Sequence, residues 1–491
     1  MEHLPALQVV VPLLAAPVCI LLRQPRLLWL WSTGISLATL LIAIGLLNRV
    51  SNLGTISYAL GGWPAPWGIE YRVDMLNAFV LLIVSGISTI VIPFARSSIK
   101  KEIHPEQIPY FYSGWLLCLT GLLGIAITGD AFNVFVFLEI SSLSSYLLVS
   151  LGTSRRSLTA AFKYLIVGTI GASFILIAIG MLYMMTGTLN MADLAERLPE
   201  VQHTRTIQAA FVFLAIGIGI KAAILPLHQW LPDAYAYAPS SVSAFMAGTA
   251  TKVSIYLLLR FFFDVFSIGF SVDIMRFDVL LLSIGVVAIF SMSVAAIFQT
   301  DVKRMLAYSS VAQIGYMLIG IGMVSVTGLT AGILHLFNHA VMKAALFLSI
   351  GCVVYRIGSS HLDDLAGLGK QMPWTMAAFV AGGLSLIGIP ITTGFVSKWY
   401  LILGALEQGW WWLGFLILLS SLLAVAYTWR VVEAAYFRPA AAGMRVREAP
   451  SSLLIPTWIL VAINIYFGVD TSLSVGTASR AANLLLTGTG G

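Results

Sequence analysis

Apolar windows of about 18 to 25 residues recur along the whole chain, and each is long enough to cross a bilayer as a helix. With 59% hydrophobic and 10% charged residues and a mean hydropathy of +0.93, the composition fits no large soluble domain. The sequence therefore predicts an all-α polytopic membrane protein with about 14 transmembrane helices. The windows start near Ala6, Leu27, Val73, Tyr110, Ala131, Ala160, Ile207, Ser240, Phe277, Met305, Gly328, Thr375, Trp410 and Ser452.

No hydrophilic stretch is long enough for a soluble domain, so residues 1–491 are predicted to form a single membrane domain. The longest connections, around 48–70, 190–206 and 438–450, are expected to be loops. The opening segment MEHLPALQ lacks the basic leading region of a signal peptide and is expected to begin the first membrane helix.

The lysines and arginines of the connections predict the orientation. If the N-terminus is external, the odd-numbered connections carry fourteen of these residues, and the even-numbered connections carry Arg49, Arg72, Arg197, Arg205, Arg276 and Arg480. Cytoplasmic loops are enriched in basic residues, so both termini are predicted to be external. The chain is expected in a prokaryotic cytoplasmic membrane as a multi-pass protein, and its net charge of +6 needs no nucleic-acid partner.

Two windows contain a proline at mid-membrane depth. Pro226 lies in KAAILPLHQW, and Pro390 lies in GLSLIGIPITTGFVSKW. Each belongs to a block of five helices, 110–264 or 277–436, and an odd helix number requires the second block to be inverted. Paired broken helices in inverted repeats point to an ion path near the midplane. The alternative is that each proline only kinks a packed helix.

The remaining windows flank these two blocks. Residues 1–109 are predicted to hold the first three helices. Residues 450–491 are predicted to hold the last helix and the external C-terminus.

Three charged residues lie deep inside windows of the first block. Glu139 has no other charge within eight residues on either side, and Lys221 and Lys252 are similarly deep. A charge at the centre of a membrane helix costs at least about 2.5–3.5 kcal/mol, so each of these residues is expected to have a functional or structural role. We expect a switchable ion pair in which Glu139 holds the charge of Lys221. A static structural ion pair is the alternative.

A second group of titratable residues follows in the other block. His335, His339 and Lys343 are spaced i, i+4, i+8, which places them on one stripe of a helix. Because histidine titrates near neutral pH, the stripe predicts a proton relay, whereas a single histidine would more often be a packing residue. His228, two residues after Pro226, and Lys398, eight residues after Pro390, extend the predicted axis.

Other charges and the cysteines are expected to have structural roles. Arg260 and Arg430 are expected to extend their charged ends to the membrane surface. Cys19, Cys118 and Cys352 are isolated in apolar stretches, so no cofactor or metal is expected. There is also no nucleophile and base pattern, so the chain is not expected to be an enzyme.

Three stretches carry a family resemblance: GIKAAILPLHQWLPDAYAYAPSSVSA, HLFNHAVMKAALFLSIG and GLSLIGIPITTGFVSKWYL. They resemble the antiporter-like membrane subunits shared by respiratory complex I, membrane-bound hydrogenases and Mrp-type multisubunit cation/proton antiporters. The similarity extends across essentially the whole chain. The length of 491 residues and the lysine in GFVSKW are most similar to the D subunit of the Mrp type.

The resemblance implies fourteen helices, two inverted five-helix repeats and proton translocation. Glu139 is similar to the family's acid in the fifth helix, and Lys221 is similar to its partner in the seventh. Lys252 matches the connecting lysine of the eighth helix, and Lys398 matches the lysine of the twelfth. His335 and His339 lie in the polar stripe of the eleventh helix.

The main hypothesis is a proton-translocating subunit of a multisubunit Na+/H+ antiporter with other hydrophobic subunits as partners. Because a lysine ammonium repels Na+, protons are assigned to this axis and Na+ is expected to cross in a partner subunit. A complex I-like or hydrogenase pump module, driven by redox chemistry in other subunits, is the alternative. A scaffold that has kept the fold without transporting is disfavoured by the intact buried charges.

Overall fold

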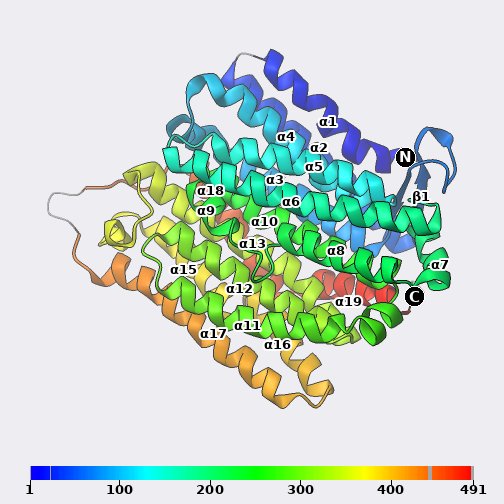
Figure 1. Cartoon of the computed structure of the whole chain (residues 1–491). Helices are drawn as coiled ribbons and strands as arrows, with labels where there is room; N and C mark the ends of the chain where they lie inside the picture. The colour runs from blue at the N-terminus through cyan, green and yellow to red at the C-terminus, as the bar shows by residue number, and fades with distance from the viewer. Residues whose placement is uncertain (1, 23, 441–444, 488–491) are drawn as a thin grey trace.

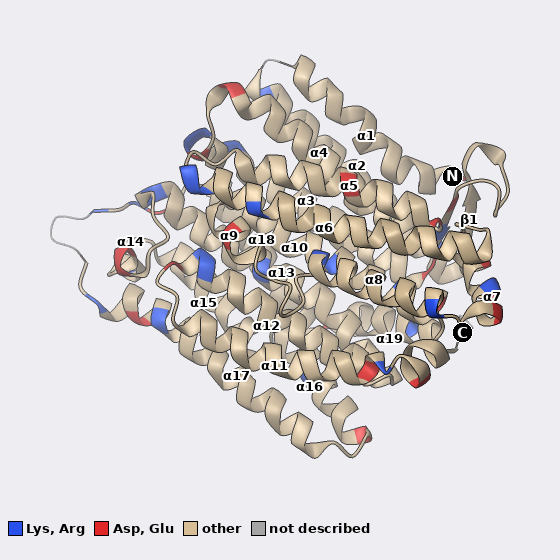
Figure 2. Ribbon diagram, viewed as in Figure 1, with Lys and Arg blue, Asp and Glu red and all other residues tan. Residues whose placement is uncertain are grey.

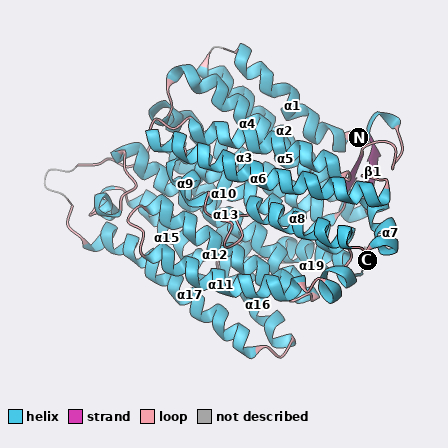
Figure 3. Cartoon of the chain, in the orientation of Figure 1, coloured by secondary structure: helices cyan, strands magenta, loops and turns pink. Residues whose placement is uncertain are grey.

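The computed structural model describes residues 2–22, 24–440 and 445–487, and almost all of this part is helical (Figure 3). The long helices pack side by side in one bundle (Figure 1). The described strands form one antiparallel hairpin, β1 (Ile56–Ala59) and β2 (Glu70–Val73), with Ile56 opposite Val73. The predicted all-α polytopic fold is therefore confirmed.

The helices are given in chain order. Up to the first break they are α1 (Leu4–Leu21), α2 (Pro25–Leu53), α3 (Met75–Glu102), α4 (Ile108–Ile127), α5 (Ala131–Ser150), α6 (Arg155–Thr186), α7 (Met191–Val201) and α8 (Arg205–Lys221). Between the breaks they are α9 (Leu231–Tyr237), α10 (Ser240–Leu259), α11 (Phe277–Ile297), α12 (Val302–Gly322), α13 (Val326–Ile357), α14 (Leu368–Gln371) and α15 (Pro373–Ile387). After the second break they are α16 (Thr393–Glu407), α17 (Trp411–Val432), α18 (Ser451–Val469) and α19 (Ser472–Thr487).

Short 3-10 and π helices extend or connect these elements. The 3-10 turns are η1 (Leu60–Gly62), η2 (Pro105–Gln107) and η5 (Leu362–Leu365), and the π helices are η3 (Arg260–Val265), η4 (Gly269–Ile274) and η6 (Glu433–Phe437).

Twelve helical segments in the described residues are long and apolar enough to span a membrane. The other two of the fourteen predicted windows correspond to the two predicted broken helices. In the first, α8 ends at Lys221, and turns that contain Pro226 lead to α9. In the second, α15 ends at Ile387 and α16 begins at Thr393, with Pro390 between them. Both predicted breaks are confirmed.

Both breaks contain backbone that an ordinary helix residue avoids. Ala223 in the first break has φ 54°, and Ile391 in the second has φ 76°. A left-handed conformation costs a non-glycine residue about 1–2 kcal/mol. Such conformations persist where the surrounding structure holds them, and they are frequent at functional sites.

A close helix crossing positions the first break. α8 packs against α6 where Gly217 meets Gly171, and a Cβ added at Gly217 would lie 2.7 Å from the carbonyl oxygen of Gly171. Small residues permit such close approaches between membrane helices. Because Lys221 is one turn further along α8, this crossing also sets where its side chain begins.

Structure appears in two connections that were expected to be loops. The stretch 48–70 contains the end of α2, the strand β1 and the first residue of β2, and 190–206 contains α7. Short strands and a helix of mixed polarity give weak signals in a search for long apolar windows. The C-terminal part likewise contains α19 after α18, where one last helix was predicted, and α19 packs against α13 and α3.

Charged residues gather at the two ends of the bundle (Figure 2). Lysines and arginines dominate the end opposite the N and C marks, whereas both signs are mixed at the end that carries these marks (Figure 2). A few basic residues also lie between the ends (Figure 2).

Candidate functional site

The first part of the site joins α5 to the last turn of α8. The Nζ of Lys221 donates hydrogen bonds to Ser142 Oγ at 2.8 Å and Tyr146 OH at 3.4 Å. Glu139 Oε1 lies 3.9 Å from the same nitrogen, which makes a loose ion pair. The Lys221 side chain is 6% exposed, whereas that of Glu139 is 27% exposed. The structure thus brings together the acid and the lysine that the sequence pairs.

A small cavity lies beside this pair. Its volume is about 20 Å³, and Ser142 and Lys221 line it together with Ser254 of α10. A space of roughly 10–15 Å³ is enough for one water molecule. The cavity therefore offers a water position between the Lys221 amine and the helix that carries Lys252.

Lys252 is buried in the middle of α10. Its amine donates to the carbonyl oxygen of Ala247 and to Thr251 Oγ1, the latter at 3.3 Å. Within the described chain, no carboxylate lies within ion-pair distance of it. The amine is therefore held by neutral oxygens alone.

The two histidines of α13 lie ring against ring. Their ring centroids are 6.0 Å apart and their planes differ by 5°. His335 is fixed on both nitrogens, by Ser397 Oγ at 2.7 Å from Nδ1 and by Gln313 Oε1 at 2.9 Å from Nε2. Because the Gln313 oxygen only accepts, Nε2 carries the hydrogen and Nδ1 accepts from Ser397.

His339 differs from His335 in its surroundings. It is fully buried, and neither of its ring nitrogens has a hydrogen-bond partner among the described residues. Lys343, one turn further on α13, donates to the Leu306 carbonyl oxygen at 2.8 Å and to Ser309 Oγ at 2.5 Å. The three residues of the predicted stripe thus lie on one helix, α13. The amine of Lys343, however, is bonded to α12 and not to the histidines.

Lys398 marks the second break. Its amine donates to the carbonyl oxygens of Leu386 at 3.1 Å and Ile387 at 2.9 Å, and to Ser421 Oγ at 3.0 Å. It also lies 4.8 Å from the centre of the Tyr316 ring, a cation–π contact. The same ring is 5.8 Å from that of His335, so Tyr316 contacts both Lys398 and His335.

Both break-site lysines lie where a half-helix ends. Lys221 is in the last turn of α8, and the Lys398 amine binds the last carbonyls of α15. The C-terminal end of a helix carries partial negative charge and stabilises a cation. Each break therefore has a lysine near the end of a half-helix, but the Lys398 amine binds that end directly, whereas the Lys221 amine binds side chains of α5.

His228 lies apart from Lys221 in the contacts that the structure records. Its ring is half-buried and meets Tyr308 edge to face, with centroids 6.5 Å apart. Pro226 is exposed. The break therefore opens to the surroundings at Pro226 while the amine of Lys221 faces α5.

The prediction for Arg260 was wrong. Its side chain is buried and binds Asp74 and Asp264 instead of extending to the membrane surface. Asp74 is 186 residues away in the sequence, so no local pattern could indicate this pairing. Arg430, by contrast, donates to the carbonyl oxygens of Ile297 and Gln299 at the end of α11, the latter at 2.9 Å.

Several polar residues of the site were missed by the sequence reasoning. Ser142 and Tyr146 follow Glu139 at i+3 and i+7, so one face of α5 presents all three to Lys221. That spacing was a usable signal in AFNVFVFLEISSLSSYLLV. Gln313 and Tyr316 gave no such signal, because α12 carries no predicted site residue, and Ser397 directly precedes Lys398 and so lies on another side of α16.

The site offers no group of metal ligands. In residues 2–22, 24–440 and 445–487, no three His, Cys, Asp or Glu side chains come together in a way that could hold a metal ion. The three cysteines are free and buried. The amines and imidazoles of the site are groups that can each bind or release a proton.

Known proteins share this arrangement of helices and sequence. The family described as NADH:quinone oxidoreductase/Mrp antiporter, TM, matches residues 128–424. The NADH-quinone oxidoreductase subunit N of Desulforudis audaxviator is 42% identical over 476 residues, which cover 93% of this chain and 94% of that protein. The D subunit of the Na(+)/H(+) antiporter of Alkalihalophilus pseudofirmus is 32% identical over 406 residues, which cover 82% of this chain and 81% of that protein.

A solved structure agrees with these relatives. A chain of the Mrp complex from Dietzia sp. DQ12-45-1b superposes with a TM-score of 0.91 at 26% identity, covering 100% of this chain and 98% of that one. The predicted resemblance to the D subunit of the Mrp type is thereby confirmed. The chain belongs to the NADH:quinone oxidoreductase/Mrp antiporter family of membrane subunits.

Proposed function

We propose that the chain is the proton-translocating subunit of a multisubunit Na+/H+ antiporter. One observation carries the proposal: the buried amines of Lys252, Lys343 and Lys398 hydrogen-bond only to neutral oxygens in the described structure. Because no carboxylate is fixed to these amines, each can release a proton without leaving a buried anion unpaired. Such side chains are suited to carry protons.

The path runs along the middle of the bundle. Lys221 takes up or releases a proton under the control of Glu139, whose contact of 3.9 Å is loose enough to be broken and remade. In this path Lys252 exchanges protons between this pair and the histidines His339 and His335. The Tyr316 ring contacts both His335 and Lys398, where the path ends. Lys343 adds a further protonatable group on α13, and His228 serves the open side of the first break.

The surroundings of the protein are part of the proposal. We place the chain in a prokaryotic cytoplasmic membrane with both termini external, because the basic end of the bundle lies opposite the N and C marks (Figure 2). The blocks 110–264 and 277–436 act as inverted repeats, each with one broken helix. Other hydrophobic subunits complete the complex, and Na+ crosses in one of them.

The test is proton flux in vesicles that contain the purified complex. Lys221→Ala and Glu139→Ala should abolish Na+-dependent proton flux while the complex still assembles. Lys163→Ala is the matched control, because Lys163 is exposed and pairs with Asp233, away from Glu139 and Lys221. Wild-type flux in either site variant would refute the assigned roles.

A second function is favoured by the relative with 42% identity, which is named as a subunit of an NADH-quinone oxidoreductase. In that case the same proton path serves a redox-driven pump. Purification of the native complex in mild detergent separates the two functions. Small hydrophobic partners and Na+-dependent flux support the antiporter, whereas iron–sulfur subunits in the preparation support the pump.

A further inference from the structure

The hydroxyl of Tyr427 is a buried polar group that the proton path does not use. Tyr427 lies near the end of α17 and is fully buried. Its hydroxyl has no hydrogen-bond partner among the described residues, and no other tyrosine in this part of the chain has a buried hydroxyl without one. A buried hydroxyl without a partner destabilises a protein, so phenylalanine would suit this position better in the arrangement that the structure shows.

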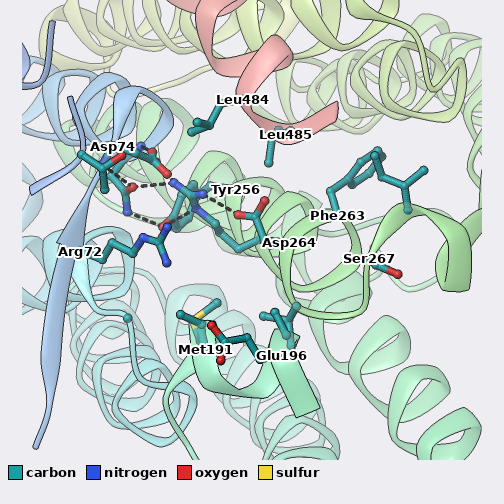
Figure 4. Close-up of a pocket in the computed structure, with 18 of the residues that line it drawn as sticks. Arg72, Asp74, Met191, Glu196, Tyr256, Phe263, Asp264, Ser267, Leu484 and Leu485 are labelled. Carbon is teal, nitrogen blue, oxygen red and sulfur yellow. Dashed lines mark hydrogen bonds and ion pairs between the residues drawn. The ribbon is translucent and has the colours of Figure 1, made fainter. Parts of the chain in front are cut away.

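Tyr256 on α10 shows the usual state of a buried tyrosine. Its hydroxyl accepts hydrogen bonds from Asn77 at 2.7 Å and from Arg260 at 3.2 Å. It donates to the carbonyl oxygen of Ala126 at 3.0 Å. Figure 4 shows this tyrosine at the wall of a charged pocket of about 490 Å³. The missing partner of Tyr427 is therefore an exception within this protein and requires a physical reason.

The group that faces the Tyr427 hydroxyl is Ser309 of α12, which is bonded to Lys343. The Lys343 amine donates to Ser309 Oγ and to the carbonyl oxygen of Leu306. The hydroxyl of Ser309 donates to the same carbonyl oxygen at 2.9 Å. Because Lys343, Ser309 and Tyr427 are all fully buried, α13, α12 and α17 meet here in one polar cluster without exposure to the surroundings.

The carbonyl oxygen of Leu306 is approached by more side-chain donors than it has lone pairs. Lys343 donates to it at 2.8 Å, Ser309 at 2.9 Å and Ser310 at 3.0 Å. A carbonyl oxygen has two lone pairs, and a hydroxyl hydrogen can rotate to another acceptor. The hydroxyl of Ser309 can therefore leave this crowded acceptor at low cost.

The number of donors around Lys343 depends on its own protonation state. An ammonium group has three N–H donors and no acceptor. Once it has passed one proton along the axis, the amine keeps two N–H donors and has a lone pair. That lone pair is a new acceptor beside Ser309, in a cluster that otherwise has surplus donors.

We infer that Tyr427 is a positioning residue for the proton on Lys343, because its hydroxyl gains a partner only when this lysine is a neutral amine. In that state the hydroxyl of Ser309 turns from Leu306 to the lone pair of the amine, and Tyr427 donates to Ser309 Oγ. Neither hydroxyl gives up its proton; the proton that Lys343 loses goes to the next acceptor of the axis. The inference rests on the proposed function, since it concerns proton release from a lysine of that axis.

The decisive variant is Tyr427→Phe in the assembled complex. It removes a hydroxyl that has no partner while Lys343 is charged, so assembly and thermal stability should be unchanged. It also removes the donor that favours the neutral amine, so Lys343 should hold its proton more tightly. Other titratable groups that act on Lys343 are Lys252 of α10 and His339 of α13, and both keep their surroundings in this variant.

The measurement is proton flux in vesicles with the same pH on both sides, repeated across a range of pH. Release needs the neutral amine, so flux rises with pH through the range in which the lysine loses its proton. Tyr427→Phe should move this rise to higher pH by about half to one unit, which lowers flux on the rise about three- to tenfold. Tyr112→Phe is the matched control, because Tyr112 is equally buried but lies beside Arg96 and Lys100, away from the axis.

A double-variant cycle tests the route through Ser309. Ser309→Ala removes the hydroxyl that links Tyr427 to Lys343, so adding Tyr427→Phe to it should cause no further shift of the pH profile. Ser310→Ala is the control for this background, because Ser310 bonds the Leu306 carbonyl oxygen and not the lysine. In the Ser310→Ala background, Tyr427→Phe should cause its full shift.

Three results would overturn the inference: an unchanged pH profile in Tyr427→Phe, a shift of its profile to lower pH, or a full further shift when Tyr427→Phe is added to Ser309→Ala. The proposed function is tested separately by Lys221→Ala. If that variant keeps its flux, the proton axis itself is refuted. If it loses flux while Tyr427→Phe keeps the parental profile, only the role of Tyr427 is rejected.

Discussion

The amine of Lys398 reaches back across the second helix break and binds the carbonyl oxygen of Ile387 at 2.9 Å. Ile387 is the last residue of α15, so the lysine neutralises the end of a half-helix that the break leaves without its next turn. Lys221 is the last residue of the half-helix α8, but its amine is bonded to Ser142 and Tyr146 of α5. Each break thus has a lysine near the end of a half-helix, but only the Lys398 amine binds the carbonyl oxygens of that end.

Gly388 makes the reach of Lys398 possible. Its φ is 94°, and a Cβ at this position would lie 2.9 Å from Cδ of Lys398. We expect Gly388→Ala to destabilise the protein by about 1–2 kcal/mol through backbone strain and also to displace the lysine and lower proton flux. Thermal unfolding and flux of the purified complex measure the two effects.

Gly358 provides the control for this variant. It has φ 73° at the end of α13, with no atom near the added Cβ. Gly358→Ala should therefore show a similar loss of stability with unchanged flux. Equal flux in both variants would contradict the role given to Gly388.

The ring of Tyr316 is expected to matter more than its hydroxyl group for proton transfer. The hydroxyl bonds Ser420 Oγ at 2.6 Å, whereas the ring faces Lys398 and His335. Tyr316→Phe should cost about 1 kcal/mol of stability and keep most of the flux. Tyr316→Leu also removes the cation–π contact, so it should lower flux several-fold. The idea fails if the two variants transport equally well.

Ser142 is expected to hold the Lys221 amine in place. A hydrogen bond to a charged group contributes about 1.5–3 kcal/mol, so Ser142→Ala should reduce proton flux by about tenfold or more. Ser144→Ala is matched to it, because Ser144 lies on the same helix and bonds only the carbonyl oxygen of Ile140. Flux is measured in vesicles after assembly has been verified, and equal flux in the two variants would show that Ser142 is dispensable.

Ser397 is expected to orient His335. Its hydroxyl oxygen lies 2.7 Å from Nδ1, and Gln313 Oε1 lies 2.9 Å from Nε2, so both ring nitrogens are held in place. Ser397→Ala frees Nδ1, and we expect slower proton flux with an intact complex. Ser349→Ala, which removes a buried hydroxyl from α13 that bonds only Ala345, should leave flux unchanged. A parental rate in Ser397→Ala would mean that the tautomer of His335 does not limit transport.

Much of the architecture was predictable, because the bilayer acts on each segment separately. A segment must be long and apolar enough to span the bilayer, and a proline in it interrupts the backbone hydrogen bonds of the helix. A charged residue in it is costly and therefore indicates a functional or structural role. These local rules identified the membrane spans, the breaks at Pro226 and Pro390, and the residues Glu139, Lys221 and Lys398. They could not detect α7 or α19, whose residues are not apolar enough to stand out.

The partners of the buried charges were decided by the tertiary structure alone. Lys221 meets Ser142 from 79 residues away, and Arg260 meets Asp74 from 186 residues away, so its expected position at the membrane surface was wrong. Sequence determines that a buried charge must be satisfied, because an unpaired charge in hydrocarbon is too costly. Which side chain satisfies it depends on how the helices pack, since residues far apart in the chain become neighbours only when the bundle closes.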